Sequence, residues 1–166
     1  MYNNVTMVEV ITNAPNETEK LATHIVSELK GDGEEERGTS TIVALQGNLG
    51  AGKTMFVKGA AESLGIKETI TSPTFVIVKM YPIGIEAPWE RLVHIDAYRL
   101  ESEKELNSID WNTLASDPKN LIFIEWPEQV GLGVPERALW LEFEAIDENT
   151  RKIIIPDTVS PPKDLA

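Results

Sequence analysis

Residues 47–54 form the segment whose residue types and spacing carry the clearest chemical meaning in this sequence. They read Gly-Asn-Leu-Gly-Ala-Gly-Lys-Thr and match the phosphate-binding pattern G-x-x-x-x-G-K-[ST] at every defined position. Glycines let the backbone approach a polyphosphate closely and adopt positive φ, so that main-chain N–H groups can surround the phosphates. Lys53 would then reach the β and γ phosphates, and the Thr54 hydroxyl would bind Mg²⁺. The pattern makes nucleotide binding the leading hypothesis.

The residues on either side supply the strand and the helix that such a loop requires. Thr41–Gln46 is a short β-branched and apolar run, which predicts a buried strand. Met55–Leu64 has apolar residues at helical spacing and is followed by Gly65, a residue typical of helix ends. The alternative is a glycine-rich turn that binds nothing, and the complete match together with both flanks argues against it.

Two acidic residues stand at the ends of other candidate strands. Asp96 follows the largely apolar residues 92–95, and Glu125 follows the apolar residues 121–124. Both could therefore lie at the crevice where open α/β sheets bind ligands. A phosphate loop needs such a carboxylate to hold Mg²⁺ or its waters. Either residue could instead mark only the point where a strand meets solvent.

Three further features allow more than one interpretation. The hydroxyl-rich segment 71–75 around Pro73 could be a loop that senses the γ phosphate, or an ordinary Ser-Pro turn. Trp126 could stack on a base, or it could fill a core or an interface. Arg99 and Arg151 could meet phosphate, although an arginine is usually a solvated surface residue.

The periodicity of the remaining chain predicts one three-layer α/β domain over residues 1–156, with a mainly parallel central sheet and antiparallel strands at its margins. A proline-rich tail, 157–166, is expected to be flexible, and the acidic segment 31–38 is expected to be an exposed loop. Further strands are predicted over 5–11, 76–81, 91–96, 120–125, 138–146 and 151–155, and helical segments over 16–29, 102–109 and 111–114.

Composition restricts the classes of function. The 166 residues carry a formal net charge of −12, so the surface as a whole should repel nucleic acid and anionic lipid. There is no cysteine, which excludes disulfides and thiolate metal sites and fits a cytoplasmic location. Residues 1–5 contain neither a basic region nor a long apolar stretch, so neither a secretion signal nor a membrane span is expected.

Four blocks in this order resemble the bacterial TsaE (YjeE) family of small ATPases. They are Gly47–Thr54, Thr71–Phe75, His94–Leu100 and Glu125–Glu128. Only the first block is shared with phosphate-loop proteins in general, so the other three carry the resemblance. It extends over about residues 16–155.

The resemblance implies an ATPase that acts with the TsaD and TsaB proteins in making N6-threonylcarbamoyladenosine at position 37 of tRNA. The chain would not itself perform the carbamoyl transfer, and tRNA would be the substrate of the pathway rather than a direct ligand. The net charge of −12 agrees with this, because such a surface should leave RNA contact to partner proteins.

The same resemblance assigns catalytic and metal-binding roles. Thr54 and Glu125 would hold Mg²⁺, and Asp96 would be needed for hydrolysis. Lys53 would stabilise the charge on the phosphates, and residues 71–75 would behave as a switch. Because catalysis of this kind is mostly positioning and charge neutralisation, a missing positive charge or an open switch loop would leave hydrolysis slow. We therefore expect weak turnover in isolation and stimulation by the TsaD and TsaB pair.

It also implies where the nucleotide lies. The indole of Trp126 would lie near the adenine, Thr18 on the first helix would help form the pocket, and Arg151 would be a late nucleotide contact. The expected cofactors are ATP and Mg²⁺. The expected contacts with the nucleotide are Thr18, Asn48, Leu49, Gly50, Ala51, Gly52, Lys53, Thr54, Met55, Trp126 and Arg151.

The main rival is a small-molecule kinase, since many such enzymes contain a phosphate loop. They usually need an arginine-rich lid, whereas the arginines of this chain number only five and are scattered. A GTPase is less well supported, because the guanine-reading motif Asn-Lys-x-Asp does not occur.

Overall fold

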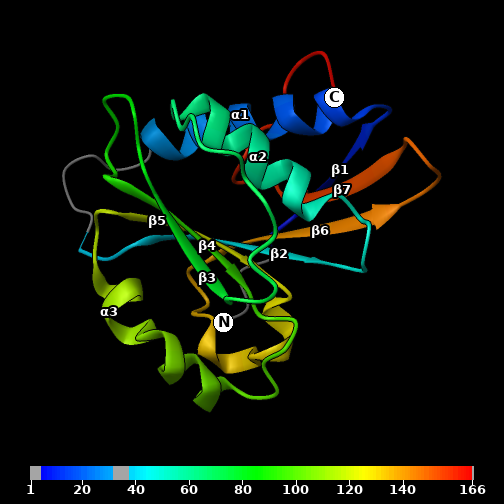
Figure 1. The fold of residues 1–166 in the computed structure, drawn as a ribbon. Helices are drawn as coiled ribbons and strands as arrows, with labels where there is room; N and C mark the ends of the chain where they lie inside the picture. The colour runs from blue at the N-terminus through cyan, green and yellow to red at the C-terminus, as the bar shows by residue number, and fades with distance from the viewer. Residues whose placement is uncertain (1–4, 32–37, 166) are drawn as a thin grey trace.

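Strand pairing organises the described residues of this computed structural model, 5–31 and 38–165, into one seven-stranded sheet with the order β1-β7-β6-β2-β5-β4-β3 (Figure 1). The strands are β1 (Met7–Thr12), β2 (Thr41–Gly47), β3 (Val78–Pro82), β4 (Arg91–Asp96), β5 (Asn120–Glu125), β6 (Leu139–Ala145) and β7 (Arg151–Pro156). The helices are α1 (Pro15–Gly31), α2 (Lys53–Ser63) and α3 (Trp111–Ser116), with 3-10 helices η1 (Glu103–Ile109), η2 (Pro127–Gln129) and η3 (Gly131–Gly133).

The centre of the sheet is parallel and its margins are antiparallel. Strands β6, β2, β5 and β4 run parallel to one another, whereas β3 is antiparallel to β4, and β7 is antiparallel to both β6 and β1. Every residue of β5 is buried, as expected for a central parallel strand that is covered on both faces. The α/β architecture with antiparallel marginal strands predicted from the sequence is therefore confirmed.

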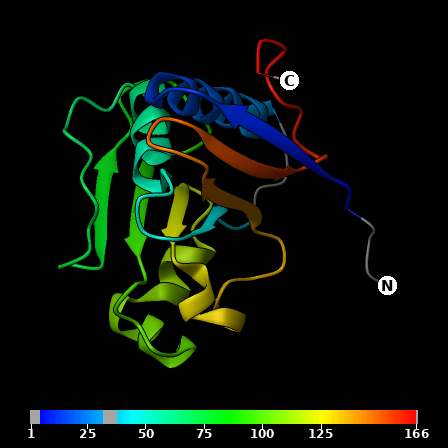
Figure 2. The same ribbon diagram turned by 90° about the vertical axis from the view of Figure 1, so that its right-hand side faces the viewer.

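Helical layers cover the two faces of the sheet, and the alternation of side chains along each strand decides which layer a residue meets (Figure 2). Along β2, Val43 and Leu45 pack in a cluster with α1 and α2. Ile42 and Ala44, which point the other way, pack in a cluster with α3 and η1. Both faces of β2 are therefore packed, and the loop that follows starts from a buried strand.

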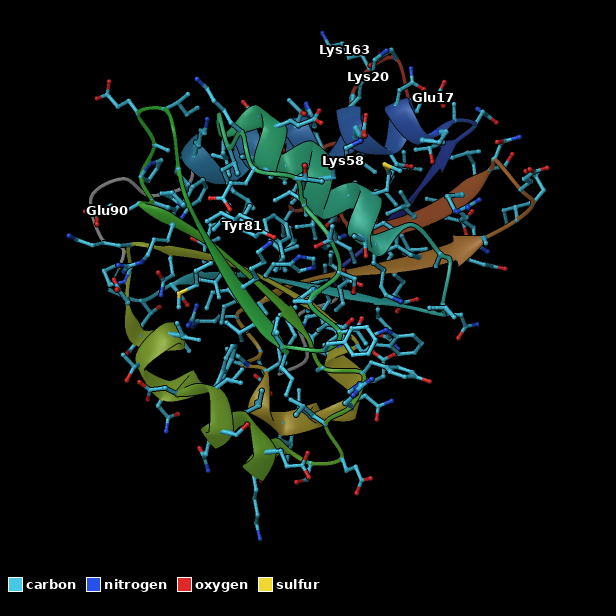
Figure 3. The ribbon with its side chains drawn as sticks, in the orientation of Figure 1. Glu17, Lys20, Lys58, Tyr81, Glu90 and Lys163 are labelled. Atoms are coloured by element: carbon cyan, nitrogen blue, oxygen red, sulfur yellow. The ribbon has the colours of Figure 1, made fainter. Side chains whose placement is uncertain are left out.

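Helices α1 and α2 approach each other closely at Gly59. A Cβ atom at Gly59 would lie 2.5 Å from the Cα of Glu19 and 2.7 Å from its carbonyl oxygen. Lys58, labelled in Figure 3, forms an ion pair with the same residue, with 3.3 Å between Lys58 Nζ and Glu19 Oε1. The absence of a side chain at Gly59 therefore sets the distance between the two helices.

Some elements differ from the sequence prediction. The segment predicted as helical over 102–109 is the 3-10 helix η1, in which Leu106 alone is buried. The strand predicted from 76 begins at Val78 instead, because the backbone turns at Ile77, whose φ is +66°. Most of the predicted acidic loop 31–38 lies outside the described residues.

Within the described part of the chain, no helix combines the length and the apolar composition that crossing a membrane requires.

The described part of the predicted flexible tail, residues 157–165, makes defined contacts with α1. Val159 is buried in the same cluster as the two helices, and Leu165 packs against it. The Ser160 hydroxyl donates a hydrogen bond to a carboxylate oxygen of Glu28 at 3.0 Å. The backbone carbonyl oxygen of Ser160 lies 2.8 Å from His24 Nε2. Apolar burial and hydrogen bonds, which the proline content does not reveal, give this segment its place.

The close contact at Gly59 predicts that Gly59→Ala destabilises the protein, although alanine is the better helix former. Because the new methyl group would meet backbone atoms, we expect a net loss of about 1–2 kcal/mol and a lower melting temperature. Thermal unfolding followed by circular dichroism measures the melting temperature of each variant. Gly31→Ala is the matched control, since a Cβ there meets nothing within 4 Å, and it should leave the melting temperature unchanged or slightly raised. Equal melting temperatures for the two variants would contradict this account of the packing.

Candidate functional site

A cavity of about 480 Å³ opens where β2, β4 and β5 reach their carboxyl ends. The two carboxylates predicted from the strand ends, Asp96 and Glu125, both line it. Asn48 does not line it. The other residues predicted to contact a nucleotide all do; these are Thr18, Leu49, Gly50, Ala51, Gly52, Lys53, Thr54, Met55, Trp126 and Arg151. One cavity thus gathers residues that are spread over more than a hundred positions of the sequence.

The loop between β2 and α2 depends on glycine at specific points. Gly47 has a φ of +151°, and a Cβ there would lie 2.5 Å from the carbonyl oxygen of Phe143 on the neighbouring strand. Gly52, with a φ of +102°, precedes the first residue of α2. The first N–H groups of a helix have no partners within the helix, so this end of α2 can bind an anion.

Lys53 supplies a cation at the same end of α2, and its side chain is buried. Its Nζ donates hydrogen bonds to the carbonyl oxygens of Gly47 and, at 3.1 Å, Asn48, and it lies 4.0 Å from the centre of the Trp126 ring. Burial lowers the pKa of Lys53, while nearby carboxylates, Glu125 foremost, partly oppose the shift. Neutral groups are its only hydrogen-bond partners among the described residues, and a phosphate would be a stronger acceptor.

Thr54 and Glu125 come together as a pair suited to Mg²⁺. The hydroxyl of Thr54 donates to Oε1 of Glu125 at 2.9 Å, and Nε2 of His94 lies 2.7 Å from the same oxygen. The Thr54 oxygen accepts no hydrogen bond from the described residues, so its lone pairs remain available. A carboxylate with a hydroxyl matches the oxygen ligands that Mg²⁺ prefers. Over residues 5–31 and 38–165, no three acidic or histidine side chains form a metal cage. The residues therefore fit a Mg²⁺ ion that takes most of its ligands from phosphates and water.

Asp96 is held by the segment predicted as a switch loop. Its Oδ2 accepts hydrogen bonds from the hydroxyls of Ser72 and Thr74, each at 2.8 Å, and its Oδ1 accepts one from the backbone N–H of Tyr98 at 2.9 Å. Asp96 lies directly beside Glu125 in the pairing of β4 with β5. A movement of the 71–75 loop would therefore change the hydrogen bonding of this carboxylate.

Trp126 and Tyr98 form an aromatic pair on the wall of the cavity. Their ring centres are 5.1 Å apart, and Trp126 has a positive φ of 58°, an unusual conformation for a bulky residue. Because the indole also covers Lys53, it borders the part of the cavity where we expect the phosphates. The contact between this ring and adenine, which the family resemblance implies, stays a prediction.

The turn between β6 and β7 closes another side of the cavity. Oδ1 of Asp147 accepts hydrogen bonds from the N–H groups of Thr150 and Asn149, which lower the pKa of this carboxyl group. Arg151 donates from Nη1 to the carbonyl of Asp147 at 2.8 Å, and its side chain passes beside Gly52. The turn thus holds an arginine next to the loop at 47–54.

The two remaining candidates have different surroundings. Thr18 is buried near the start of α1, where its hydroxyl and that of Thr12 are 2.9 Å apart. Arg99 does not line the cavity, and its guanidinium lies 4.8 Å from the ring centre of Phe75 on the 71–75 loop.

Tyr98, Pro15, Glu148 and Asn149 also line the cavity, and no role was predicted for them from the sequence. None was predicted for His94, which does not line the cavity but contacts Glu125. A signal for His94 was present, because it precedes Asp96 by two residues on one strand and so must point to the same face of the sheet. For the turn residues, a hairpin was predicted, but its position over the 47–54 loop follows from the pairing of β6 with β2.

Comparison with known proteins gives a consistent result. Residues 12–153 match the family model described as "Threonylcarbamoyl adenosine biosynthesis protein TsaE". A "tRNA threonylcarbamoyladenosine biosynthesis protein TsaE" from Aquifex aeolicus is 35% identical over 149 residues, 89% of this chain and 94% of the relative. The protein of the same name from Treponema pallidum is 36% identical over 115 residues, 69% of this chain and 81% of the relative.

A solved structure shares the fold. The crystal structure of YdiB from Bacillus subtilis superposes with a TM-score of 0.67 and 24% sequence identity, and the match covers 98% of this chain and 91% of YdiB.

The contact between Lys53 and the Trp126 ring predicts a fluorescence signal. A phosphate ligand that draws the ammonium away would change the surroundings of the indole, so adding ADP with Mg²⁺ should change the emission of the protein. Trp126→Phe should remove most of this change. Trp140→Phe serves as the control, since Trp140 does not line the cavity, and should keep it. A full response in Trp126→Phe would show that the ligand does not affect this contact.

Proposed function

This chain belongs to the TsaE family of threonylcarbamoyl adenosine biosynthesis proteins, and from that premise we propose that it is a Mg²⁺-dependent ATPase serving this modification of tRNA. The observation that carries the proposal is the meeting of Thr54 with Glu125 at 2.9 Å, in a cavity that Lys53 and Asp96 also line. These four side chains correspond to the parts that phosphate-loop ATPases use to hold and cleave a triphosphate.

In the proposed complex, the β and γ phosphates of ATP lie against the backbone N–H groups of residues 47–54, with Lys53 as the counter-charge. Thr54 and Glu125 would hold Mg²⁺. The ion, when bound, would neutralise part of the charge on the phosphate oxygens. Thr18 near the start of α1 and Arg151 at the start of β7 would contact the rest of the nucleotide.

We assign to Asp96 the role of preparing the attacking water for hydrolysis. It would orient the water or accept its proton, and Ser72 and Thr74 would fix the carboxylate in place. Because catalysis of this kind consists mainly of positioning and charge stabilisation, a loop that is not fully closed leaves hydrolysis slow. Slow turnover in isolation is therefore part of the proposal.

We further propose that the TsaD and TsaB proteins stimulate this turnover, and that tRNA enters as the substrate of the pathway. The net charge of −12 supports a division of labour in which partner proteins contact the RNA. The cytoplasm is the proposed location.

The decisive experiment measures phosphate release from MgATP by the protein alone and then with TsaD, TsaB and tRNA. The proposal requires slow release alone and faster release with the partners. Absence of a partner effect, together with transfer of labelled γ phosphate to a metabolite, would favour a small-molecule kinase instead.

Lys53→Ala should reduce the rate of ATP hydrolysis by about 100-fold or more, as expected when a group that stabilises transition-state charge is removed. Lys58→Ala is the matched control, because Lys58 lies on the same helix but pairs with Glu19 outside the cavity, and it should retain the wild-type rate. Near wild-type turnover in Lys53→Ala would exclude this assignment of the site.

Asp96→Ala should still bind ATP yet lose hydrolysis, because binding rests on the 47–54 loop. The double variant Ser72→Ala/Thr74→Ala keeps the carboxylate but removes two of its hydrogen bonds, so we expect an intermediate loss of about tenfold. Single-turnover hydrolysis and equilibrium ATP binding, measured on both variants, separate the two steps. A normal single-turnover rate in Asp96→Ala would remove Asp96 from the mechanism.

A further inference from the structure

His94 is a buried histidine in direct contact with the carboxylate of Glu125. The side chain of His94 is 0% exposed and that of Glu125 is 4% exposed, and 2.7 Å separates Nε2 from Oε1. An ionised carboxylate can only accept hydrogen bonds, so the hydrogen-bond network assigns the proton to Nε2. Nδ1 is buried and has no partner among the described residues, which agrees with an unprotonated nitrogen at that position. The histidine is therefore a donor to Glu125.

The same carboxylate oxygen receives a second donor from a different element. Thr54 Oγ1, at the start of α2, donates to Oε1 at 2.9 Å, and His94 donates from β4. The other oxygen of Glu125, Oε2, has no hydrogen-bond partner among residues 5–31 and 38–165, and Glu125 lines the cavity. Two donors thus hold one oxygen while the other stays free.

We infer that His94 is a positioning residue that holds the Glu125 carboxylate in the orientation needed to bind a divalent cation. This inference rests on the proposed function, because it assigns the cation to the Thr54 and Glu125 pair. A carboxylate at the end of a strand can rotate about its side-chain bonds. The hydrogen bond from Thr54 alone would leave it free to pivot around Oε1, whereas a second donor from another element restricts that rotation.

A hydrogen bond to a metal ligand contributes to metal affinity because it orients that ligand. Loss of such a partner typically weakens metal binding by about 10–100-fold. A purely structural role for His94 predicts something different, since a change in packing would alter stability and nucleotide affinity whether or not metal is present. The dependence of nucleotide binding on Mg²⁺ therefore separates the two roles.

The test compares His94→Gln with His94→Asn. The glutamine amide nitrogen can reach the position of Nε2 and keep the donor to Glu125, whereas the shorter asparagine reaches only the position of Nδ1. For each variant, the affinity for a fluorescent, non-hydrolysable ATP analogue is measured in Mg²⁺ and in EDTA. The ratio of the two affinities reports the Mg²⁺ contribution, and each variant serves as its own reference. His24→Asn, which changes a histidine outside the cavity, is the matched control.

We expect His94→Gln and His24→Asn to keep the wild-type ratio within about threefold, and His94→Asn to lower it by about tenfold or more. Equal ratios for His94→Gln and His94→Asn would overturn the inference, because the donor to Glu125 would then be irrelevant. A wild-type protein that binds the analogue without any effect of Mg²⁺, or does not bind it, would overturn the proposed function as well.

Discussion

The parallel pairing of β4 and β5 with β2 is the constraint on which the site depends. Parallel strands end at the same edge of a sheet, and here Asp96 is paired with Glu125, which is itself paired with Leu45 two residues before the loop begins. Side chains alternate between the faces, so a slip of one residue would turn a carboxylate away from α2. The apolar strands that enforce this register are buried on both sides, so the energy of the core also fixes the geometry of the cavity.

Within that frame, the three charged side chains of the proposed site are held by hydrogen bonds. The ammonium of Lys53 donates to backbone carbonyls, Asp96 accepts from two hydroxyls and an N–H group, and Oε1 of Glu125 accepts from a hydroxyl and an imidazole. No ion pair joins Lys53 to either carboxylate among the described residues. Hydrogen bonds of this kind meet the cost of burial without neutralising the charges. The cavity therefore retains both signs of charge for a ligand that carries phosphates and a cation.

The segment from 71 to 77 connects this network to the surface. Ser72 and Thr74 bind Asp96, and Phe75 is exposed. The segment ends at Ile77, where a β-branched residue adopts a positive φ, a strain of about 1–3 kcal/mol that surrounding contacts must sustain. Hydrogen bonds from Ile77 N to Pro73 and from Asp96 N to Ile77 O supply such contacts. The same loop thus contacts Asp96 and exposes Phe75, which fits the proposal that turnover depends on partners.

The sequence alone determined the parts of the site that are local. Residues 47–54 dictate their own conformation because the glycines and the flanking strand and helix are contiguous, and the apolar runs before Asp96 and Glu125 sufficed to predict buried strands that end in carboxylates. The mainly parallel sheet could be predicted for the same reason. Tertiary structure alone decided the contact of His94 with Glu125, 31 positions apart, and that of Thr54 with Glu125, 71 positions apart. Strand order and register bring these residues together, and both arise from packing of the whole core, which no local pattern encodes.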